Sequence, residues 1–264
     1  MTRPPAGASV VHGPDVPGRV LTVRSPMSLR PVLAVTSVGA LLLLTGCGAA
    51  AFGPSRTEER PADGVTAVEL STSGTLVVEH GDEPSLTVTA GRNVLAQLTS
   101  EVRDGVLVLD HDDRPGWSRT GAVEYRLVVD HLDAVRVEGS GTVRVDGDVA
   151  TGDELAILLE GSGDVRVEGV DVDELDASNQ GSGSITLAGA ADVQRVTVAG
   201  SGGYDAAALR TREAAVAVEG SGDVAVDVTG TLDASVSGSG SVTHSGGAEV
   251  TSDLDGSGSV REAS

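Results

Sequence analysis

The sequence contains no lysine, so all 18 of its basic side chains are arginines, and they face 39 aspartates and glutamates. This absence excludes a Schiff-base lysine and the lysine of a phosphate-binding P-loop. The formal net charge of −21 opposes contact with phosphate backbones and anionic lipid headgroups, so we expect no nucleic-acid partner. Aromatic residues make up only 2% of the chain, so stacking platforms for bases are also excluded.

Cysteine is equally scarce. Cys47 is the only one, so no disulfide can form within the chain. It follows an uncharged apolar run at residues 32–44, preceded by Arg30. The run matches the ~7–15 residues of a signal-peptide core and is shorter than the ~20 of a spanning helix, which disfavours the alternative of a stop-transfer segment.

The residues before the cysteine, Leu44-Thr45-Gly46, resemble a bacterial lipobox, in which the cysteine is lipidated and becomes the new N-terminus. Two acyl chains on Cys47 would give a stable anchor. The sequence therefore predicts a lipoprotein held at the cell membrane through Cys47, with its domain on the extracytoplasmic face.

These signals divide the chain. Residues 27–46 are predicted to be the lipoprotein signal peptide, and residues 1–26 an extension that is disordered or, if translation begins at Met27, absent from the protein. Residues 47–61 lack periodicity and contain proline and charge, which predicts a tether. Residues 62–264 are expected to form one domain.

A repeat dominates that domain. The tripeptide Gly-Ser-Gly begins at residues 139, 161, 181, 200, 220, 238 and 256, and spacings of about 20 residues are typical of solenoids. Valines alternate with polar residues on both sides of it, as in Val135 and Val137 before the first copy and Val143 and Val145 after it. A period of two indicates strands, whereas a flexible Gly/Ser linker would lack it. The pattern predicts an all-β parallel β-helix, or solenoid, with the glycines at corners that need positive φ.

Upstream of the repeats, short apolar or alternating segments predict further strands that continue or cap the solenoid. They lie at residues 65–70, 75–79, 86–89, 101–102, 106–109 and 123–129. Residues 93–100 are the one stretch that suggests a helical turn, and residues 111–121 suggest an exposed loop.

The ordered blocks at residues 64–70, 74–81, 101–109 and 132–141, followed by the Gly-Ser-Gly units, resemble the head GIN domain family (DUF2807). The resemblance covers roughly residues 61–264. It implies a right-handed parallel β-helix and a cell-surface role of the adhesin type, and it supplies no catalytic residues.

Motifs of common enzymes are absent. The chain has no Gly-x-Ser-x-Gly elbow, no dinucleotide fingerprint and no Cys-x-x-Cys, and its five histidines are scattered, so we expect no cofactor and no metal site. The Asp110-His111-Asp112-Asp113 cluster could hold Ca²⁺ or Mg²⁺ but is interpreted as a solvated loop.

The residues that precede the corners supply the candidate site. Glu138, Glu160 and Glu219 each stand directly before a Gly-Ser-Gly, and stacked rungs would align such positions in a column with about 4.7–4.9 Å per rung. We name this set the acidic column. It is either a surface that binds a cation or basic partner, or plain solvated surface.

These observations predict a non-catalytic surface solenoid that binds a cell-wall glycan or protein ligand, or serves as an envelope component. The alternative is a polysaccharide lyase or hydrolase, for which Arg136, Arg144 and Arg166 would have to converge with carboxylates. Interleaved arginine and glutamate more often form surface ion pairs, which disfavours that alternative.

Overall fold

The computed structural model describes residues 54–112 and 121–263, and within these ranges all elements but one short helix are strands. Cys47, the expected signal peptide and residues 1–26 lie outside the described residues. The N-terminal elements are β1 (Ser55–Arg60), β2 (Ala67–Leu70), β3 (Thr75–His80), β4 (Ser85–Gly91), α2 (Arg92–Leu95), β5 (Leu98–Arg103), β6 (Val106–His111) and β7 (Glu124–Val129). The repeats form β8 (Ala134–Gly139), β9 (Thr142–Asp146), β10 (Thr151–Gly161), β11 (Asp164–Asn179), β12 (Ser184–Gly200), β13 (Gly203–Gly220), β14 (Asp223–Gly238), β15 (Ser241–Ser245), β16 (Glu249–Gly256) and β17 (Ser259–Glu262).

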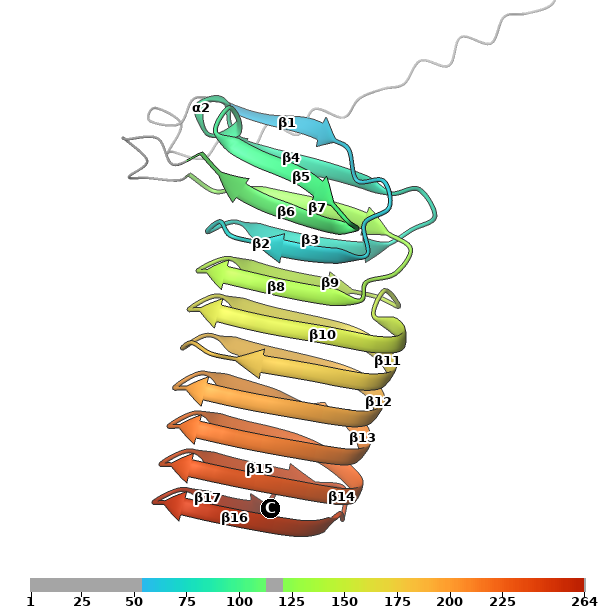
Figure 1. Ribbon diagram of the computed structural model, residues 1–264. Coiled ribbons are helices and arrows are strands. Elements are labelled where there is room, and N and C mark those ends of the chain that lie inside the picture. Colours follow the sequence, from blue (N-terminus) through green and yellow to red (C-terminus); the bar gives the residue numbers. More distant parts are fainter. Residues whose placement is uncertain (1–53, 113–120, 264) are drawn as a thin grey trace, which may run out of the picture. The chain divides into compact units, whose positions relative to one another are not determined.

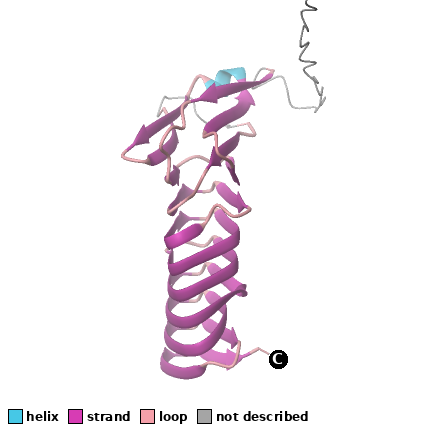
Figure 2. Cartoon of the chain, turned by 90° about the vertical axis from the view of Figure 1, so that its right-hand side faces the viewer, coloured by secondary structure: helices cyan, strands magenta, loops and turns pink. Residues whose placement is uncertain are grey.

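The repeats wind into stacked parallel coils, which confirms the predicted solenoid (Figure 1). Each long strand bends and belongs to two successive rungs, as the side view shows (Figure 2). The start of β11 pairs with β9, whereas its second half leads into the next corner beside β10. We call the sheet of segments that run into the corners sheet 1, and the sheet of segments that leave them sheet 2.

Alternation along each segment places the apolar side chains inside the coil. In one rung, Leu155, Ile157 and Leu159 of sheet 1 and Val165 and Val167 of sheet 2 are at most 2% exposed. Burying each contributes roughly 1.5–3 kcal/mol, against a backbone entropy cost of ~1–2 kcal/mol for every ordered residue. A rung of about 20 residues is therefore stable only through its stacked neighbours.

The glycines of the corners are required by the stacking itself. The first glycine has positive φ at six of the seven corners, for example +136° at Gly161 and +137° at Gly220. From the second corner on, a Cβ on either glycine would collide with the preceding rung, as at Gly183, where it would meet the carbonyl oxygen of Gly163. The serine N–H between them donates to that preceding corner, as from Ser221 to the carbonyl of Gly200 at 2.9 Å.

The first rungs do not follow chain order. Strand β2 pairs in parallel with both β6 and β8, and β3 pairs in parallel with both β7 and β9. The β2–β3 rung therefore lies between the β6–β7 rung and the first repeat. Beyond it, β4 pairs antiparallel with β7 and with β1, and β5 pairs antiparallel with β6.

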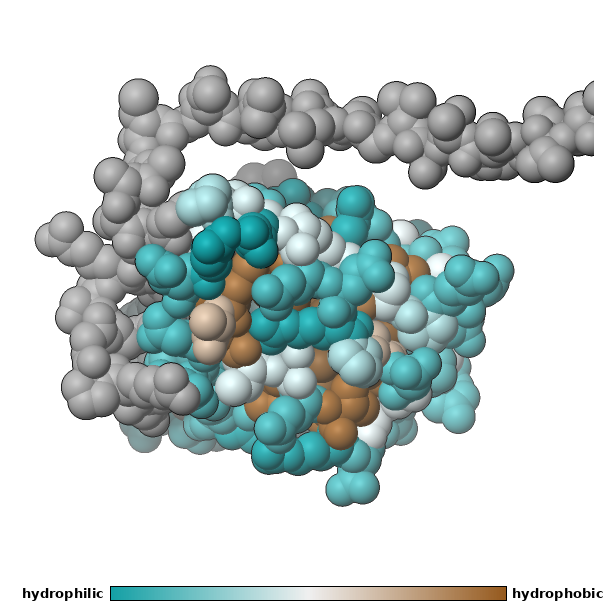
Figure 3. All heavy atoms as spheres, turned by 90° about the horizontal axis from the view of Figure 1, so that it is seen from above, coloured by the Kyte–Doolittle hydropathy of each residue, from teal (hydrophilic) through white to brown (hydrophobic). Residues whose placement is uncertain are grey.

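These antiparallel strands cap the solenoid, as the sequence predicted. Seen from that end, hydrophilic residues cover most of the visible surface, with smaller hydrophobic areas between them (Figure 3). The cap thus separates the apolar interior of the rungs from solvent at this end.

Two sequence expectations need correction. The expected tether, residues 47–61, includes β1, which pairs with β4 along its whole length, so the folded part begins by Ser55. Arg60 secures this strand by donating to the carbonyl oxygens of Leu98 at 2.9 Å and Leu95 at 3.2 Å. The expected helical turn is confirmed only at α2, because residues 98–100 belong to β5. Of the expected loop, residues 113–120 lie outside the described residues.

A buried polar network interrupts the apolar core. The Tyr204 hydroxyl donates to Oε1 of Gln194 at 3.0 Å, and Nε2 of Gln194 donates to Oγ1 of Thr211 at 2.7 Å. Thr211 in turn donates to the carbonyl oxygen of Asp227 at 2.9 Å. The three side chains are at most 2% exposed, and each buried polar group has a partner, which limits the cost of burial.

This network generates a prediction about alkaline stability. Burial raises the pKa of Tyr204 far above its ordinary value of 10.0, and burial also raises the pKa of Tyr125. Above about pH 10 the unfolded state loses a phenolic proton that the folded state keeps. The free energy of unfolding is therefore unaffected by this group below that pH and falls as the pH rises above it. No lysine titrates in the same range, so these tyrosines dominate the effect.

We expect Tyr204→Phe to be less stable by about 1–3 kcal/mol at pH 7, because it leaves Gln194 without its donor. Above pH 10 the free energy of unfolding should fall less steeply in this variant than in the unaltered protein. Urea titrations at pH 7 to 11 measure both effects, and equal alkaline slopes would contradict the account.

Candidate functional site

The structure brings two residues of the acidic column together and leaves the third apart. Glu138 and Glu160 occupy adjacent register positions of β8 and β10 in sheet 1. Glu219 lies in β13, where it pairs with Ala199 on one side and Ser237 on the other. Column positions without a carboxylate therefore separate it from the first two.

The carboxylates of Glu138 and Glu160 share one arginine. Nη2 of Arg136 lies 2.6 Å from Oε1 of Glu138 and 2.7 Å from Oε2 of Glu160, so the guanidinium bridges two rungs. Although desolvation by burial opposes ionisation, the two carboxylates raise the pKa of Arg136 above its ordinary value. All three side chains are about 40% exposed, so the pairs fix geometry more than they stabilise the fold.

This bridge confirms the expected surface ion pairs and changes the chemistry of the column. Arg136 already supplies the positive charge that a bound cation would bring to Glu138 and Glu160. Glu219, by contrast, forms no ion pair with any part of the chain that the structure describes. The column thus offers two oriented carboxylates that share one positive charge, and one carboxylate without an ion pair in the described chain.

A second arginine repeats the arrangement in sheet 1. Nη1 of Arg195 lies 2.9 Å from Oε2 of Glu174 and 3.7 Å from Oδ1 of Asp176. Between the two arginine clusters the sheet surface forms a shallow hollow. Its lining includes Ala134, Ala156, Leu158, Ser178 and Thr197.

The corner beside the acidic column is polar along its length. Each corner has one central serine, and all of them are exposed: Ser140, Ser162, Ser182, Ser201, Ser221, Ser239 and Ser257. They form a band of hydroxyl, carboxylate and amide groups, which we name the polar strip, with the polar residues that precede the corners: Glu138, Glu160, Gln180, Glu219, Ser237 and Asp255. Ala199 is the one apolar residue in this row. Groups repeated at about 4.7–4.9 Å suit an extended ligand better than a compact one.

The three arginines considered for catalysis do not converge on one site. Arg136 lies on sheet 1, whereas Arg144 and Arg166 occupy paired positions on sheet 2. Nε of Arg166 binds Oε1 of Glu168, two residues along its own strand, at 3.0 Å. Within the described residues these side chains therefore line no common cleft of the kind that the enzyme alternative requires.

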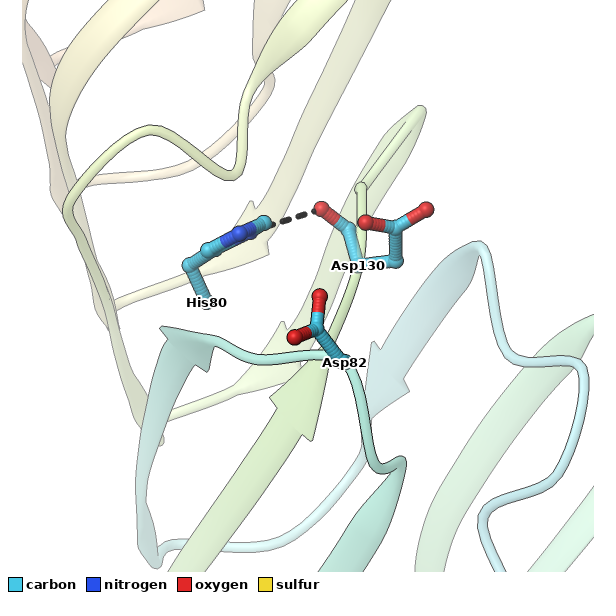
Figure 4. Close-up of side chains that lie close together, drawn as sticks. All are labelled: His80, Asp82 and Asp130. Carbon is cyan, nitrogen blue, oxygen red and sulfur yellow. Dashed lines mark hydrogen bonds between the residues drawn. The ribbon is translucent and has the colours of Figure 1, made fainter.

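One further cluster of possible metal ligands was not predicted from the sequence. Ligand atoms of His80, Asp82 and Asp130 lie within 4.8 Å of one another, and all three residues are exposed (Figure 4). His80 ends β3, Asp82 lies in the turn that follows, and Asp130 follows β7. The parallel β3–β7 pairing sets His80 opposite Val129 and so brings Asp130 beside it. Only the His80-Gly81-Asp82 spacing is visible locally; the register with β7 is not.

The acidic loop expected around residues 110–113 shows local contacts. The His111 backbone N–H donates to Oδ1 of Asp110 at 2.7 Å, and Nδ1 of His111 lies 3.4 Å from the same oxygen. Asp113 lies outside the described residues.

Among the described residues, no helix has the length and apolar character needed to cross a membrane.

Solved structures share this architecture. A putative adhesin from Bacteroides fragilis NCTC 9343 has a TM-score of 0.75 at 21% identity, covering 80% of this chain and 97% of that one. A putative lipid binding protein from Parabacteroides distasonis ATCC 8503 has a TM-score of 0.65 at 24% identity, with coverage of 80% and 98%. A putative adhesin from Parabacteroides merdae ATCC 43184 has a TM-score of 0.65 at 21% identity, with coverage of 80% and 97%. At these identities the likeness establishes the fold alone.

No curated protein matches the sequence. A family model does: residues 65–248 match the family described as putative auto-transporter adhesin, head GIN domain. The family and these structural neighbours are named as putative adhesins or a putative lipid binding protein and not as enzymes, which fits a non-catalytic protein of the cell surface. This match spans most of the solenoid and its cap, and the chain therefore belongs to the head GIN domain family.

Proposed function

We propose that this protein is a lipoprotein, anchored through Cys47 on the extracytoplasmic face of the cell membrane, whose solenoid binds a cell-wall glycan along the polar strip. The membership in an adhesin family supports the binding role. The apolar run and lipobox-like residues before Cys47 support the anchor. In this arrangement residues 47–54 would tether the folded part to the bilayer.

The observation that carries the proposal is the Arg136 bridge between Glu138 and Glu160. Side chains held in one geometry before a ligand arrives lose less conformational entropy on binding. Carboxylate oxygens accept hydrogen bonds from sugar hydroxyls, and the neighbouring serine hydroxyls both donate and accept. The strip thus presents oriented polar groups at a regular spacing.

A glycan fits this surface better than a basic protein or a nucleic acid. The acids nearest the corner are partly neutralised by Arg136, which weakens attraction for a second cation. The remaining net charge opposes polyanions. A neutral, hydroxyl-rich, extended polymer is not repelled by the net negative charge, and its binding does not depend on attraction between a cation and unpaired carboxylates.

The binding prediction concerns the two bridged carboxylates. In the full chain, purified in detergent, we expect saturable binding to cell-wall glycans on an array that also carries matrix proteins, in the presence and absence of Ca²⁺. The double variant Glu138→Gln, Glu160→Gln should weaken this binding at least tenfold, because the amides lose the charge that orients Arg136. Glu219→Gln should have a smaller effect, since Glu219 stands apart.

Glu168→Gln is the matched control, because Glu168 forms a similar surface ion pair with Arg166 on sheet 2. It should leave glycan binding unchanged. Equal loss in this control would show a non-specific charge effect, and the absence of any glycan binding would refute the proposed function.

The anchor generates a separate prediction. In cells fed an alkyne fatty acid, the protein should carry the label and remain with the membranes, because two acyl chains give stable attachment. The Cys47→Ser variant should lose the label. Labelling that persists in Cys47→Ser would contradict the assignment of the modified residue.

A further inference from the structure

The His80, Asp82 and Asp130 cluster lies away from the polar strip. Strand β3 begins at its corner with Thr75 and ends at His80, so the cluster occupies the opposite edge of sheet 2. Its members come from the β3–β4 turn and from the connection that follows β7 (Figure 4). Neither the family nor the proposed glycan binding gives these side chains a role.

We propose that His80, Asp82 and Asp130 bind a Zn²⁺ ion that fastens the β3–β4 turn to the β7–β8 connection. One imidazole nitrogen and two carboxylate oxygens are a ligand set that zinc accepts, with the fourth position left to water. An imidazole ligand disfavours Ca²⁺ and Mg²⁺, which prefer oxygen donors.

The distances are compatible with this assignment. Zinc–ligand bonds of about 2.0–2.1 Å place the ligand atoms of a tetrahedral site about 3.4 Å apart. One ring nitrogen of His80 and one carboxylate oxygen from each of Asp82 and Asp130 lie within 4.8 Å of one another. All three side chains are exposed, so no tight packing opposes the rotations that would close the remaining gap.

The histidine is also held by the backbone. With its proton on Nδ1, the His80 ring donates to the carbonyl oxygen of Asp130, 3.0 Å away. This tautomer leaves Nε2 unprotonated, as zinc ligation requires. A backbone carbonyl on the second ring nitrogen is a common way of orienting a metal-binding histidine.

The carboxylates of the cluster are available. Along the described chain the arginine ion pairs go to other acids, and neither Asp82 nor Asp130 receives one. Asp130 does approach a second histidine, with Oδ2 lying 3.8 Å from Nδ1 of His131. That contact is longer than a hydrogen bond, so it leaves the Asp130 carboxylate free to turn toward the ion.

A bound ion would have a structural effect. The chain leaves the β2–β3 rung through the β3–β4 turn and leaves the β6–β7 rung after β7, and these two rungs are the ones stacked out of chain order. Joining the two connections would fasten the capped end of the solenoid. Because the ion binds only the folded state, it would also raise the unfolding temperature.

The test is calorimetric titration of the full chain with ZnCl₂, together with thermal unfolding at each zinc concentration. We expect one saturable site per chain and an unfolding temperature that rises with zinc. His80→Gln, Asp82→Asn and Asp130→Asn should each weaken zinc binding at least tenfold, while their circular dichroism spectra without zinc stay unchanged.

Two controls match the chemistry. Asp192→Asn removes an exposed carboxylate elsewhere, and His131→Gln removes the neighbouring histidine, and both should leave the zinc affinity unchanged. Absence of stoichiometric zinc uptake would overturn the proposal. An equal loss of affinity in Asp192→Asn would overturn it too, because the binding would then be diffuse attraction to an acidic surface.

Discussion

Successive corners of this solenoid approach so closely that the backbone of one corner lies where a Cβ atom of the next would be. The collision would occur with the carbonyl oxygen of the preceding corner, at Gly181 as at Gly183. The same approach lets each corner serine N–H bond to the rung before it, as from Ser239 to Gly220 at 2.8 Å. Rung spacing, strand register and the alignment of outward side chains all depend on this contact.

The consequences for function arise from that alignment. Because the corners are alike, residues at equivalent positions of successive rungs lie side by side. Arg136 can therefore reach the acids of two rungs, and Arg195 can reach both Glu174 and Asp176 of the preceding rung. The protein therefore presents repeated polar groups along its sides. Such a surface suits an extended ligand, and it resembles neither a closed pocket nor a cleft of converging catalytic groups.

The repeats could be predicted from sequence because strand alternation and corner spacing are local properties. Glu138 and Glu160 followed from the same stacking. The position of β2 between β6 and β8 could not be predicted, because all three segments alternate alike and no local feature selects the partner. Strand β1 was missed because it is held by backbone pairing and buries little apolar surface. His80 and Asp130 meet only through the β3–β7 register, fifty positions apart in the chain.

The most direct test of the central constraint compares two adjacent glycines. A Cβ at Gly202 would collide with the buried side-chain amide of Asn179 in the preceding rung and lie 2.6 Å from the carbonyl oxygen of Gly183, whereas a Cβ at Gly203 would meet nothing nearer than Cβ of Ser184 at 4.0 Å. Measured by urea titration of the full chain, Gly202→Ala should lower the free energy of unfolding by about 2–4 kcal/mol, and Gly203→Ala should change it by less than about 1 kcal/mol. Equal effects of the two substitutions would contradict the account, because the corner would then tolerate the side chain that close stacking forbids.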